Sequence, residues 1–259
     1  MSYSFKILYS GSDGNAAQLA ENGCAVLIDA GRSARTLSAA LREAGLEPAA
    51  LSAIFLTHEH RDHTAALDVF LRHHPVPVHT AGLSRERLAR ELSPEALTLI
   101  VPHPPIFTET VGPFTFASFP TPHDSDESVG YRITVADRGE THVVGYATDL
   151  GSINAAVEQG LMGCEAVVLE CNHDEQMLSD GPYPADLKRR IASRRGHLSN
   201  ADCAAFSARL AEAGMKRLAL AHLSKINNLP ELALGEVAAA LAGTGVTIAV
   251  AAPDHITEL

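Results

Sequence analysis

A short segment that begins at residue 57 reads T-H-E-H-R-D-H-T and contains a His-x-His-x-Asp-His pattern. His58 and His60 are two positions apart. Asp62 and His63 are adjacent, so the four side chains point to two sides of one short loop. One metal ion cannot easily gather all four, whereas two ions that share the loop can. The apolar run Ala53–Leu56 before the loop predicts a buried strand, and ligand sites in layered α/β folds lie at strand ends. The segment therefore predicts two metal half-sites; the alternative is a polar loop with incidental histidines.

The length and composition of the chain indicate the class of protein to which this loop belongs. A length of 259 residues allows a large core, and 46% apolar with 20% charged residues is typical of a globular enzyme. No stretch is long enough for a membrane-spanning helix, and no basic segment followed by an apolar one opens the chain. The four cysteines show no C-x-x-C spacing, so we expect reduced thiols in a cytoplasmic protein.

The charge distribution gives two opposite indications. A formal net charge of -11 argues against non-specific binding of nucleic acid by the overall field. Five of the 20 basic residues nevertheless lie within the eight positions 188–195, just before His197. A solvated helix face is the ordinary explanation of such a run, but its position next to His197 favours a functional one. The five residues are Lys188, Arg189, Arg190, Arg194 and Arg195.

The first half of the chain predicts an opening meander of strands and then alternating helices and strands. Gly45 is well placed to end a helix that begins at Ser33. Pro77 places its short strand near a sheet edge, because proline has no N–H for the ladder. The predicted strands are 5–9, 16–20, 24–28, 54–56 and 76–79, and the predicted helices are 33–44 and about 64–73.

The second half repeats this scheme. Ser199–Asp202 has a capping-box pattern that opens a helix to about Ala213. No linker or low-complexity tract divides the chain. We therefore expect a single α/β domain over residues 1–259, with two sheets packed face to face and helices on both outer faces. The predicted strands of this half are 114–119, 130–135, 142–147, 166–169, 217–221 and 246–251, with a short helix after the third.

Three further polar residues each interrupt an apolar run at its carboxyl end. His123, Asp149 and His222 follow the predicted strands 114–119, 142–147 and 217–221. A buried ionisable group at such a place needs a partner, and a metal ion is one. A capped strand end explains one such residue, but three of them together with the loop indicate a shared metal site.

These residues, in this order, resemble the motifs of the metallo-β-lactamase superfamily, whose fold is a four-layer αββα sandwich. Four segments resemble its YycJ (WalJ) branch more narrowly, and the similarity covers essentially the whole chain. That branch has been linked to exonuclease action on DNA. Asp13, where a second serine is expected, departs mildly from the pattern. The four segments are Y-S-G-S-D-G-N from residue 9, L-E-C-N-H-D from 169, G-H-L-S-N from 196 and H-L-S-K-I-N-N from 222.

The resemblance implies a site with two divalent ions. Asp29 would steady the loop rather than bind metal. Histidine and carboxylate ligands accept Zn²⁺, Mn²⁺ or Fe²⁺, so the metal is left open. The implied ligand sets share Asp149: His58, His60 and His123 hold one ion, and Asp62, His63 and His222 hold the other.

Two ions about 3.5–4 Å apart hold a hydroxide at neutral pH and favour an anionic substrate. Asp62 would act in catalysis through its ion. His197 is the best candidate for a general acid, because it lies 25 residues before His222, as a similarly placed histidine does in tRNA-processing members of the superfamily. A histidine that merely precedes a capped helix is the alternative. The candidate substrate contacts are Lys188, Arg189, Arg195, Asn227 and Asn228, and loop stabilisation is an equal alternative for the two asparagines.

The leading hypothesis is a phosphodiesterase acting on nucleic acid, with DNA preferred and digestion from the 5′ to the 3′ end. A hydrolase of a thioester, a lactone or a small phosphodiester is the second hypothesis, although it has no use for five clustered cations. The third is a protein whose ions only hold the fold together. One of Asn172, His173 and Asp174 is expected to support the ligands. The sequence around the other histidines indicates no function, and we expect them to lie on the surface or in the core. They are His73, His74, His79, His103, His142 and His255.

Overall fold

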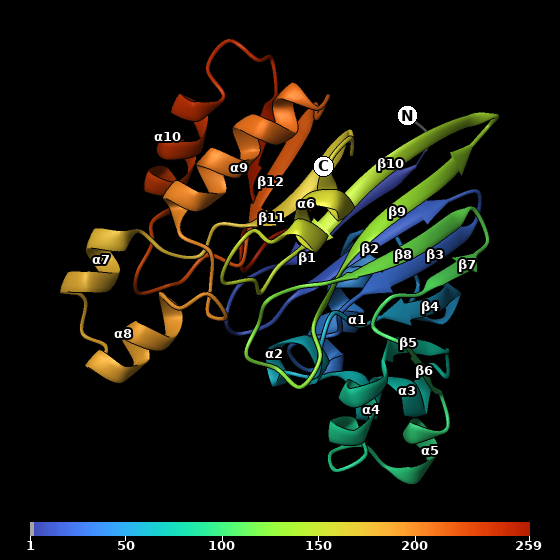
Figure 1. Cartoon of the computed structure of the whole chain (residues 1–259). Helices are drawn as coiled ribbons and strands as arrows, with labels where there is room; N and C mark the ends of the chain where they lie inside the picture. Colours follow the sequence, from blue (N-terminus) through green and yellow to red (C-terminus); the bar gives the residue numbers. More distant parts are fainter. Residues whose placement is uncertain (1–2) are drawn as a thin grey trace.

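Two β-sheets of seven strands each form the centre of the protein, in a computed structural model that describes residues 3–259 (Figure 1). Residues 1 and 2 of the predicted domain lie outside this described part. The first three pairings of the first sheet are antiparallel and the last three are parallel. In spatial order this sheet contains β14 (Thr257–Glu258), β1 (Ser4–Tyr9), β2 (Ala16–Glu21), β3 (Cys24–Ile28), β4 (Leu51–Phe55), β5 (Val78–Ala81) and β6 (Ile100–His103).

The second sheet also contains three parallel and three antiparallel pairings of strands. Three parallel pairings are followed by three antiparallel ones, so each sheet joins a meander to a parallel half. Carboxyl ends of parallel strands meet at one sheet edge, which is where a shared site can form. In spatial order this sheet contains β13 (Thr247–Val250), β12 (Arg217–Ala221), β11 (Ala166–Glu170), β10 (Glu140–Ala147), β9 (Val129–Asp137), β8 (Phe114–Pro120) and β7 (Thr108–Val111).

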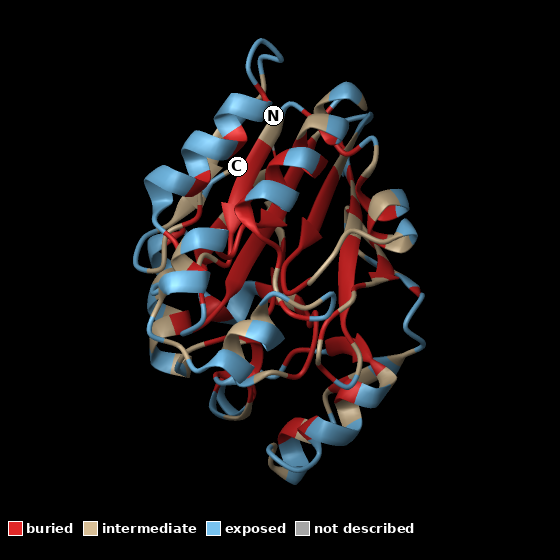
Figure 2. Cartoon of the chain, turned by 60° about the vertical axis from the view of Figure 1, so that its left-hand side comes forward, coloured by how far each residue is buried: buried red, intermediate tan, exposed pale blue. Residues whose placement is uncertain are grey.

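Helices lie outside the two sheets, and Figure 1 shows α9 and α10 beside β11 and β12. Figure 2 shows that buried residues concentrate on the strands while exposed residues follow the outer sides of the helices. Within residues 3–259, none of the helices has the length and apolar character needed to cross a bilayer. The helices are α1 (Ala34–Glu43), η1 (Pro48–Ala50), α2 (Arg61–Thr64), α3 (Leu67–His73), α4 (Gly82–Leu88), α5 (Pro94–Leu97), α6 (Ala155–Leu161), α7 (Glu175–Asp180), α8 (Ala185–Ile191), α9 (Asn200–Glu212) and α10 (Pro230–Ala240).

Three apolar clusters fill the spaces between the layers. The first lies between the sheets, where Phe55 of β4 stacks on Phe116 of β8 with ring centroids 3.7 Å apart. The second packs the first sheet against α1 and α3, and it includes Phe70. The third packs the second sheet against α6, α9 and α10, and it includes Phe206. Three interfaces between four layers confirm the predicted αββα sandwich.

Local sequence signals account for most of the predicted elements. The Ser33 side chain accepts a hydrogen bond from the Thr36 N–H at the start of α1, and Gly45 follows its end with a φ of +88°. The Ser199 side chain accepts a hydrogen bond from the Asp202 N–H at the start of α9, as the capping pattern predicts. All eleven predicted strands lie within or overlap observed ones.

Two predictions for the first half of the chain differ in detail from the structure. The strand around Pro77 lies near an edge, as predicted, but one place inside it, since β5 pairs with both β4 and the edge strand β6. Pro77 lies just before β5, and its carbonyl accepts a hydrogen bond from the Ile54 N–H, which needs no proline N–H. The predicted helix 64–73 begins earlier, at Arg61, and is divided into α2 and α3 because the main chain of Ala30 binds both the His63 carbonyl and the Ala66 N–H.

Candidate metal centre

The predicted metal ligands lie at the carboxyl ends of strands, where the two sheets meet at one edge. The strand order explains this placement, since β10, β11 and β12 run parallel and so do β3 and β4. We call the seven predicted ligands the strand-end cluster. His58, His60, Asp62 and His63 follow β4, His123 follows β8, Asp149 follows β10 and His222 follows β12.

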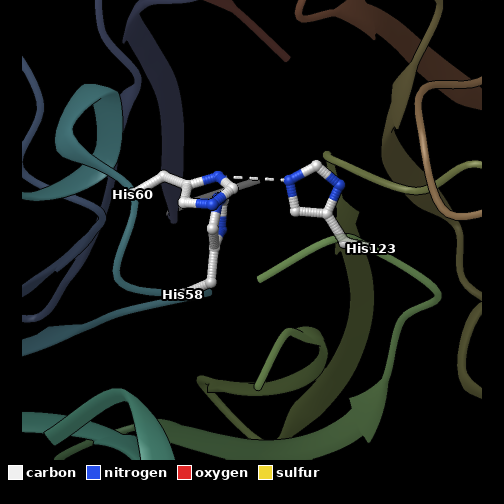
Figure 3. Close-up of side chains that lie close together, drawn as sticks. All are labelled: His58, His60 and His123. Carbon is white, nitrogen blue, oxygen red and sulfur yellow. Dashed lines mark hydrogen bonds between the residues drawn. The ribbon is translucent and has the colours of Figure 1, made fainter. Parts of the chain in front are cut away.

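Three histidines form the first group of ligands. One ring nitrogen from each of His58, His60 and His123 lies within 4.8 Å of the others. Figure 3 shows the three rings pointing toward one another, and His60 Nδ1 lies 3.3 Å from His123 Nε2. Burial lowers the pKa of His58 and of His123, so both rings are neutral and able to bind a cation.

The second group adds two carboxylates to two imidazoles. One ligand atom from each of Asp62, His63, Asp149 and His222 lies within 4.8 Å of the others. The His63 Nε2 atom is 3.4 Å from Asp62 Oδ2 and 3.1 Å from Asp149 Oδ2. Burial opposes the charged form of Asp149, but the neighbouring His222 and His63 outweigh it and hold the pKa of Asp149 well below its ordinary value.

Asp149 lies between the two groups. Its Oδ1 atom is 3.8 Å from His123 Nε2 in the first group and 3.6 Å from His222 Nε2 in the second. Asp149 is only 2% exposed, and the neighbouring His222 and His63 keep its carboxylate ionised inside the protein. A buried negative charge shared by two sets of ligands is a suitable counter-charge for cations.

The backbone is strained at the same place. Among residues 3–259, six residues other than glycine have a positive φ, and three of them belong to this site. These are Asp29 at +59°, Asp149 at +56° and His222 at +56°. Such conformations are rare for side-chain-bearing residues and cluster at functional sites.

The residues fit a divalent metal ion. The Nε2 atom of His58 is buried and has no hydrogen-bond partner within the described chain, although it points at the rings of its group. A buried polar atom without a partner is costly, and a bound cation removes that cost. The donors are imidazoles and carboxylates, which is the set that Zn²⁺, Mn²⁺ and Fe²⁺ accept.

Asp29 lies behind the ligands and belongs to neither group. Its Oδ2 atom is 2.8 Å from His63 Nδ1, and its Oδ1 atom accepts a hydrogen bond of 2.8 Å from the Thr57 N–H. Burial opposes protonation of His63, but the carboxylates of Asp29, Asp149 and Asp62 outweigh it and raise the pKa of His63 well above its ordinary value. Asp29 thereby orients the His63 ring and fixes the start of the loop.

Glu170, which the sequence analysis did not single out, joins the strand-end cluster to His197. Its Oε1 atom is 2.7 Å from His197 Nδ1 and 2.9 Å from His222 Nδ1. Burial opposes its charged form, but the charges and hydrogen bonds of His197 and His222 lower the pKa of Glu170 to about 2. Glu170 ends the apolar run of β11, so the signal that indicated Asp149 and His222 was also present here.

His197 lies beside the metal ligands. Its ring centroid is 5.3 Å from that of His123 and 5.2 Å from that of His222. Burial opposes its protonation, but Glu170 outweighs it and raises the pKa of His197. The side chain is 23% exposed, which leaves it accessible from a cavity of about 480 Å³ that it lines.

Asn15 is a second residue that the sequence analysis missed. Its Nδ2 atom lies 3.1 Å from His63 Nε2 and 3.4 Å from Asp62 Oδ2, while its Oδ1 atom accepts a hydrogen bond from the Gly11 N–H. In the sequence analysis, Asn15 appears only as the last residue of the Y-S-G-S-D-G-N segment. Gly31 shows how closely Asn15 approaches the loop, since a Cβ on Gly31 would lie 1.9 Å from the Asp62 carbonyl oxygen and 2.6 Å from the Asn15 backbone nitrogen.

The basic segment is divided by the structure. Lys188 and Arg189 of α8 line the same 480 Å³ cavity as His197. Arg190 forms an ion pair with Asp124. The Arg195 guanidinium donates a hydrogen bond of 2.9 Å to the His123 carbonyl, so it supports a predicted ligand from behind.

The two asparagines near the C-terminal end of the site are both buried, with Asn227 0% and Asn228 4% exposed. The Asn228 Nδ2 atom donates to the carbonyls of Cys171 and Asn172, which favours the loop-stabilising alternative over substrate contact. Asn172 supports the ligands, since its Nδ2 atom donates a hydrogen bond of 2.8 Å to the His222 carbonyl.

Comparison with known proteins confirms the predicted family. The family model of the beta-lactamase superfamily domain matches residues 25–223. An exodeoxyribonuclease YycJ of Bacillus anthracis is 33% identical over 100% of this chain and 96% of its own length. An exodeoxyribonuclease WalJ of Streptococcus pneumoniae serotype 2 (strain D39 / NCTC 7466) is 32% identical over 99% of this chain and 97% of its own. The metallo-β-lactamase fold protein YhfI of Bacillus subtilis has the same fold, with a TM-score of 0.72, 20% identity and coverage of 99% and 100%.

Proposed function

The chain belongs to the beta-lactamase superfamily and is a metal-dependent hydrolase, and from this premise we propose that it cleaves phosphodiester bonds of DNA as a 5′-to-3′ exonuclease with two divalent ions. The observation that carries the proposal is the position of His197. It lies beside the strand-end cluster and lines a cavity to which Lys188 and Arg189 contribute their cationic side chains. A phosphodiesterase needs these three parts together: cations, a proton donor and a grip on phosphate.

The two groups of ligands provide for two ions that share Asp149. His58, His60 and His123 would hold one ion, and Asp62, His63 and His222 would hold the other. When bound, such a pair supplies a hydroxide at neutral pH and neutralises charge on the attacked phosphoryl group.

His197 would donate a proton to the leaving oxygen. Its Nδ1 atom is engaged by Glu170, so its Nε2 atom is the one that faces substrate. Glu170 raises the pKa of His197 and therefore favours the imidazolium form that a general acid requires. Because Glu170 also contacts His222 Nδ1, it positions the proton donor relative to the ligands.

The cavity beside His197 suits a nucleotide. Its volume of about 480 Å³ lies in the usual range for small-molecule sites. Lys188 and Arg189 line the cavity with His173, His197 and Ser199, and two carboxylates, those of Glu175 and Asp202, also belong to its lining. These cations act locally, so the net charge of -11 does not exclude a DNA substrate. A DNA substrate also agrees with the cytoplasmic location predicted from the composition.

Digestion of end-labelled DNA tests the proposal. Single-stranded and duplex DNA, labelled at the 5′ or the 3′ end, would be incubated with Mn²⁺ or Zn²⁺ and the products sized. We expect mononucleotides released first from the 5′ end, and no release by Asp149→Asn. Release from the 3′ end would contradict the direction, and cleavage of RNA alone would contradict the substrate.

The competing hydrolase activity is tested in the same experiment. A thioester and a generic phosphodiester would be offered to the same protein preparation. Turnover of the thioester without cleavage of any nucleic acid would replace the proposal with the thioester or lactone alternative. No turnover of either, with metal bound and the protein folded, would favour a purely structural role of the ions.

A further inference from the structure

A second cluster of possible metal ligands lies away from the strand-end cluster. His79 of β5, His103 of β6 and Glu109 of β7 each offer one atom, and these atoms lie within 4.8 Å of one another. The cluster shares no residue with the two ligand groups of the strand-end cluster. These two histidines have no functional context in the sequence, because they become neighbours only when β5 and β6 pair.

The residues of this cluster come from both sheets. β6 is the edge strand of the first sheet, and β7 is the edge strand of the second. His103 is paired with Ala81 across β5 and β6, so His79 and His103 are diagonal neighbours on one face. Ala81 belongs to the core between the sheets, which identifies that face as the inner one. Glu109 approaches the two rings from the opposite sheet.

Aromatic packing holds both rings in place. The His79 ring stacks on Phe55 with centroids 4.7 Å apart, and the His103 ring stacks on Phe107 at 4.2 Å. The two histidine rings are nearly parallel, with an angle of 22° between them. Ligands that are already ordered lose little conformational entropy when an ion binds.

The chemistry of the three groups suits a transition-metal ion. His79 Nδ1 and His103 Nε2 are joined by a hydrogen bond of 2.9 Å, and two nitrogens on one tetrahedral zinc stand about 3.3 Å apart, so an ion would replace this hydrogen bond after a shift of a few tenths of an ångström. Burial lowers the pKa of both histidines, which keeps the rings neutral as metal ligands must be. His79 is 6% exposed, while His103 and Glu109 are half-buried, so the open side can admit water as a fourth ligand.

We propose that His79, His103 and Glu109 form a second kind of metal site, which binds one divalent transition-metal ion such as Zn²⁺ and links the edges of the two sheets. We call it the sheet-edge site. An ion here connects β5 and β6 to β7, strands that belong to different sheets. Its role is structural, because its ligands come from strands of two different sheets. The proposal does not depend on the substrate of the strand-end cluster.

Metal counting tests the sheet-edge site. Wild-type protein, His103→Gln and Glu109→Gln would be equilibrated with buffered Zn²⁺, and the ions per chain measured by elemental analysis. His73→Gln is the matched control, because His73 is an exposed histidine outside every cluster of ligands found in residues 3–259. We expect wild type and control to hold one ion more than His103→Gln, and Glu109→Gln to bind that ion at least tenfold more weakly.

A second measurement separates metal loss from misfolding. Zn²⁺ should raise the melting temperature of wild type and control by about 3 °C or more beyond the rise seen for Glu109→Gln. The half-buried Glu109 lies at the rim of the core, so its glutamine variant is expected to fold. The difference in ion count should persist in the Asp149→Asn background. Equal ion counts in wild type and both variants would overturn the proposal, and the two stacked histidines would then be ordinary packing.

Discussion

The protein contains two histidine clusters that are supported in different ways. In the strand-end cluster, carboxylates stand behind the imidazoles: Asp29 faces His63 Nδ1 at 2.8 Å and Glu170 faces His222 Nδ1 at 2.9 Å. In the sheet-edge site, aromatic rings take that place, and the outer faces of the histidines stack on phenylalanines. The first arrangement tunes charge, whereas the second only fixes position.

The backbone conformation also differs between the two clusters. Asp149 and His222 have positive φ values, just beyond the strands that carry them. His79 and His103 lie within regular strands. Strain of this kind persists only where the surroundings enforce it, and it is common where chemistry takes place. We therefore expect the proposed reactivity to depend on the charged supports of the strand-end cluster, and the sheet-edge site to depend on packing alone.

Asp149→Asn would have the largest effect, because it removes the buried negative charge that lies 3.8 Å from His123 of the first group and 3.6 Å from His222 of the second. We expect kcat on labelled DNA to fall by at least about 10²–10³-fold. The side chain keeps its size, so the circular dichroism spectrum should not change. His79→Gln is the counterpart in the other cluster, and its kcat should stay within about twofold of wild type. Similar losses in both variants would break the distinction between the clusters.

Glu170→Gln tests whether the charged support matters. Loss of this carboxylate removes the group that orients both His197 and His222. We expect a fall in kcat of about 10–100-fold, with the optimum of the pH profile moved to lower pH because the pKa of His197 is no longer raised. Glu165→Gln is the matched control, since Glu165 also contacts a histidine, His142, at 2.8 Å. An unchanged pH profile for Glu170→Gln would contradict its positioning role.

Phe55→Leu examines the packing support of the other cluster. Phe55 stacks on His79 and on Phe116, so the shorter side chain leaves a gap between the sheets. We expect a loss of about 1–3 kcal/mol in the free energy of unfolding, measured by urea denaturation. Leu83→Ala, at a side chain that is 49% exposed, should change it by less than about 0.5 kcal/mol. Equal stabilities of the two variants would show that the stack contributes nothing.

The sequence predicted the strand-end cluster because its members carry a local signal. His123, Asp149 and His222 each end a buried apolar run, and such runs can be recognised without knowledge of the fold. Glu170 carries the same signal but was passed over, since a glutamate is not part of the usual ligand pattern. Asn15 carries none, because its contact with His63 depends on the close approach of two turns.

The sheet-edge site could not be predicted in this way. His79 and His103 are separated by 24 positions and meet only through the pairing of β5 with β6. β7 was also not predicted, since its T-E-T-V sequence alternates between exposed and half-buried residues and lacks an apolar run. The same reason explains why α7 and α8 were missed: α8 has no buried residue, so no apolar periodicity marks it.

The smallest predicted effect concerns the cavity through which DNA would reach the strand-end cluster. It tests whether DNA approaches this cluster and not the sheet-edge site. Figure 1 shows α8 at the side of the sandwich, and its Lys188 and Arg189 line the cavity next to His197 rather than the sheet-edge site. Replacing both by Ala should raise KM for DNA by about 3–10-fold and leave kcat nearly unchanged. The slope of the logarithm of the binding constant against the logarithm of the salt concentration should fall by about one to two, because one to two phosphate contacts are lost. The matched double variant Arg35→Ala with Arg42→Ala removes two exposed cations from α1 and should leave KM unchanged. If both double variants raised KM equally, exposed cations anywhere on the surface would serve DNA binding alike, and the cavity beside His197 would not be its path to the strand-end cluster.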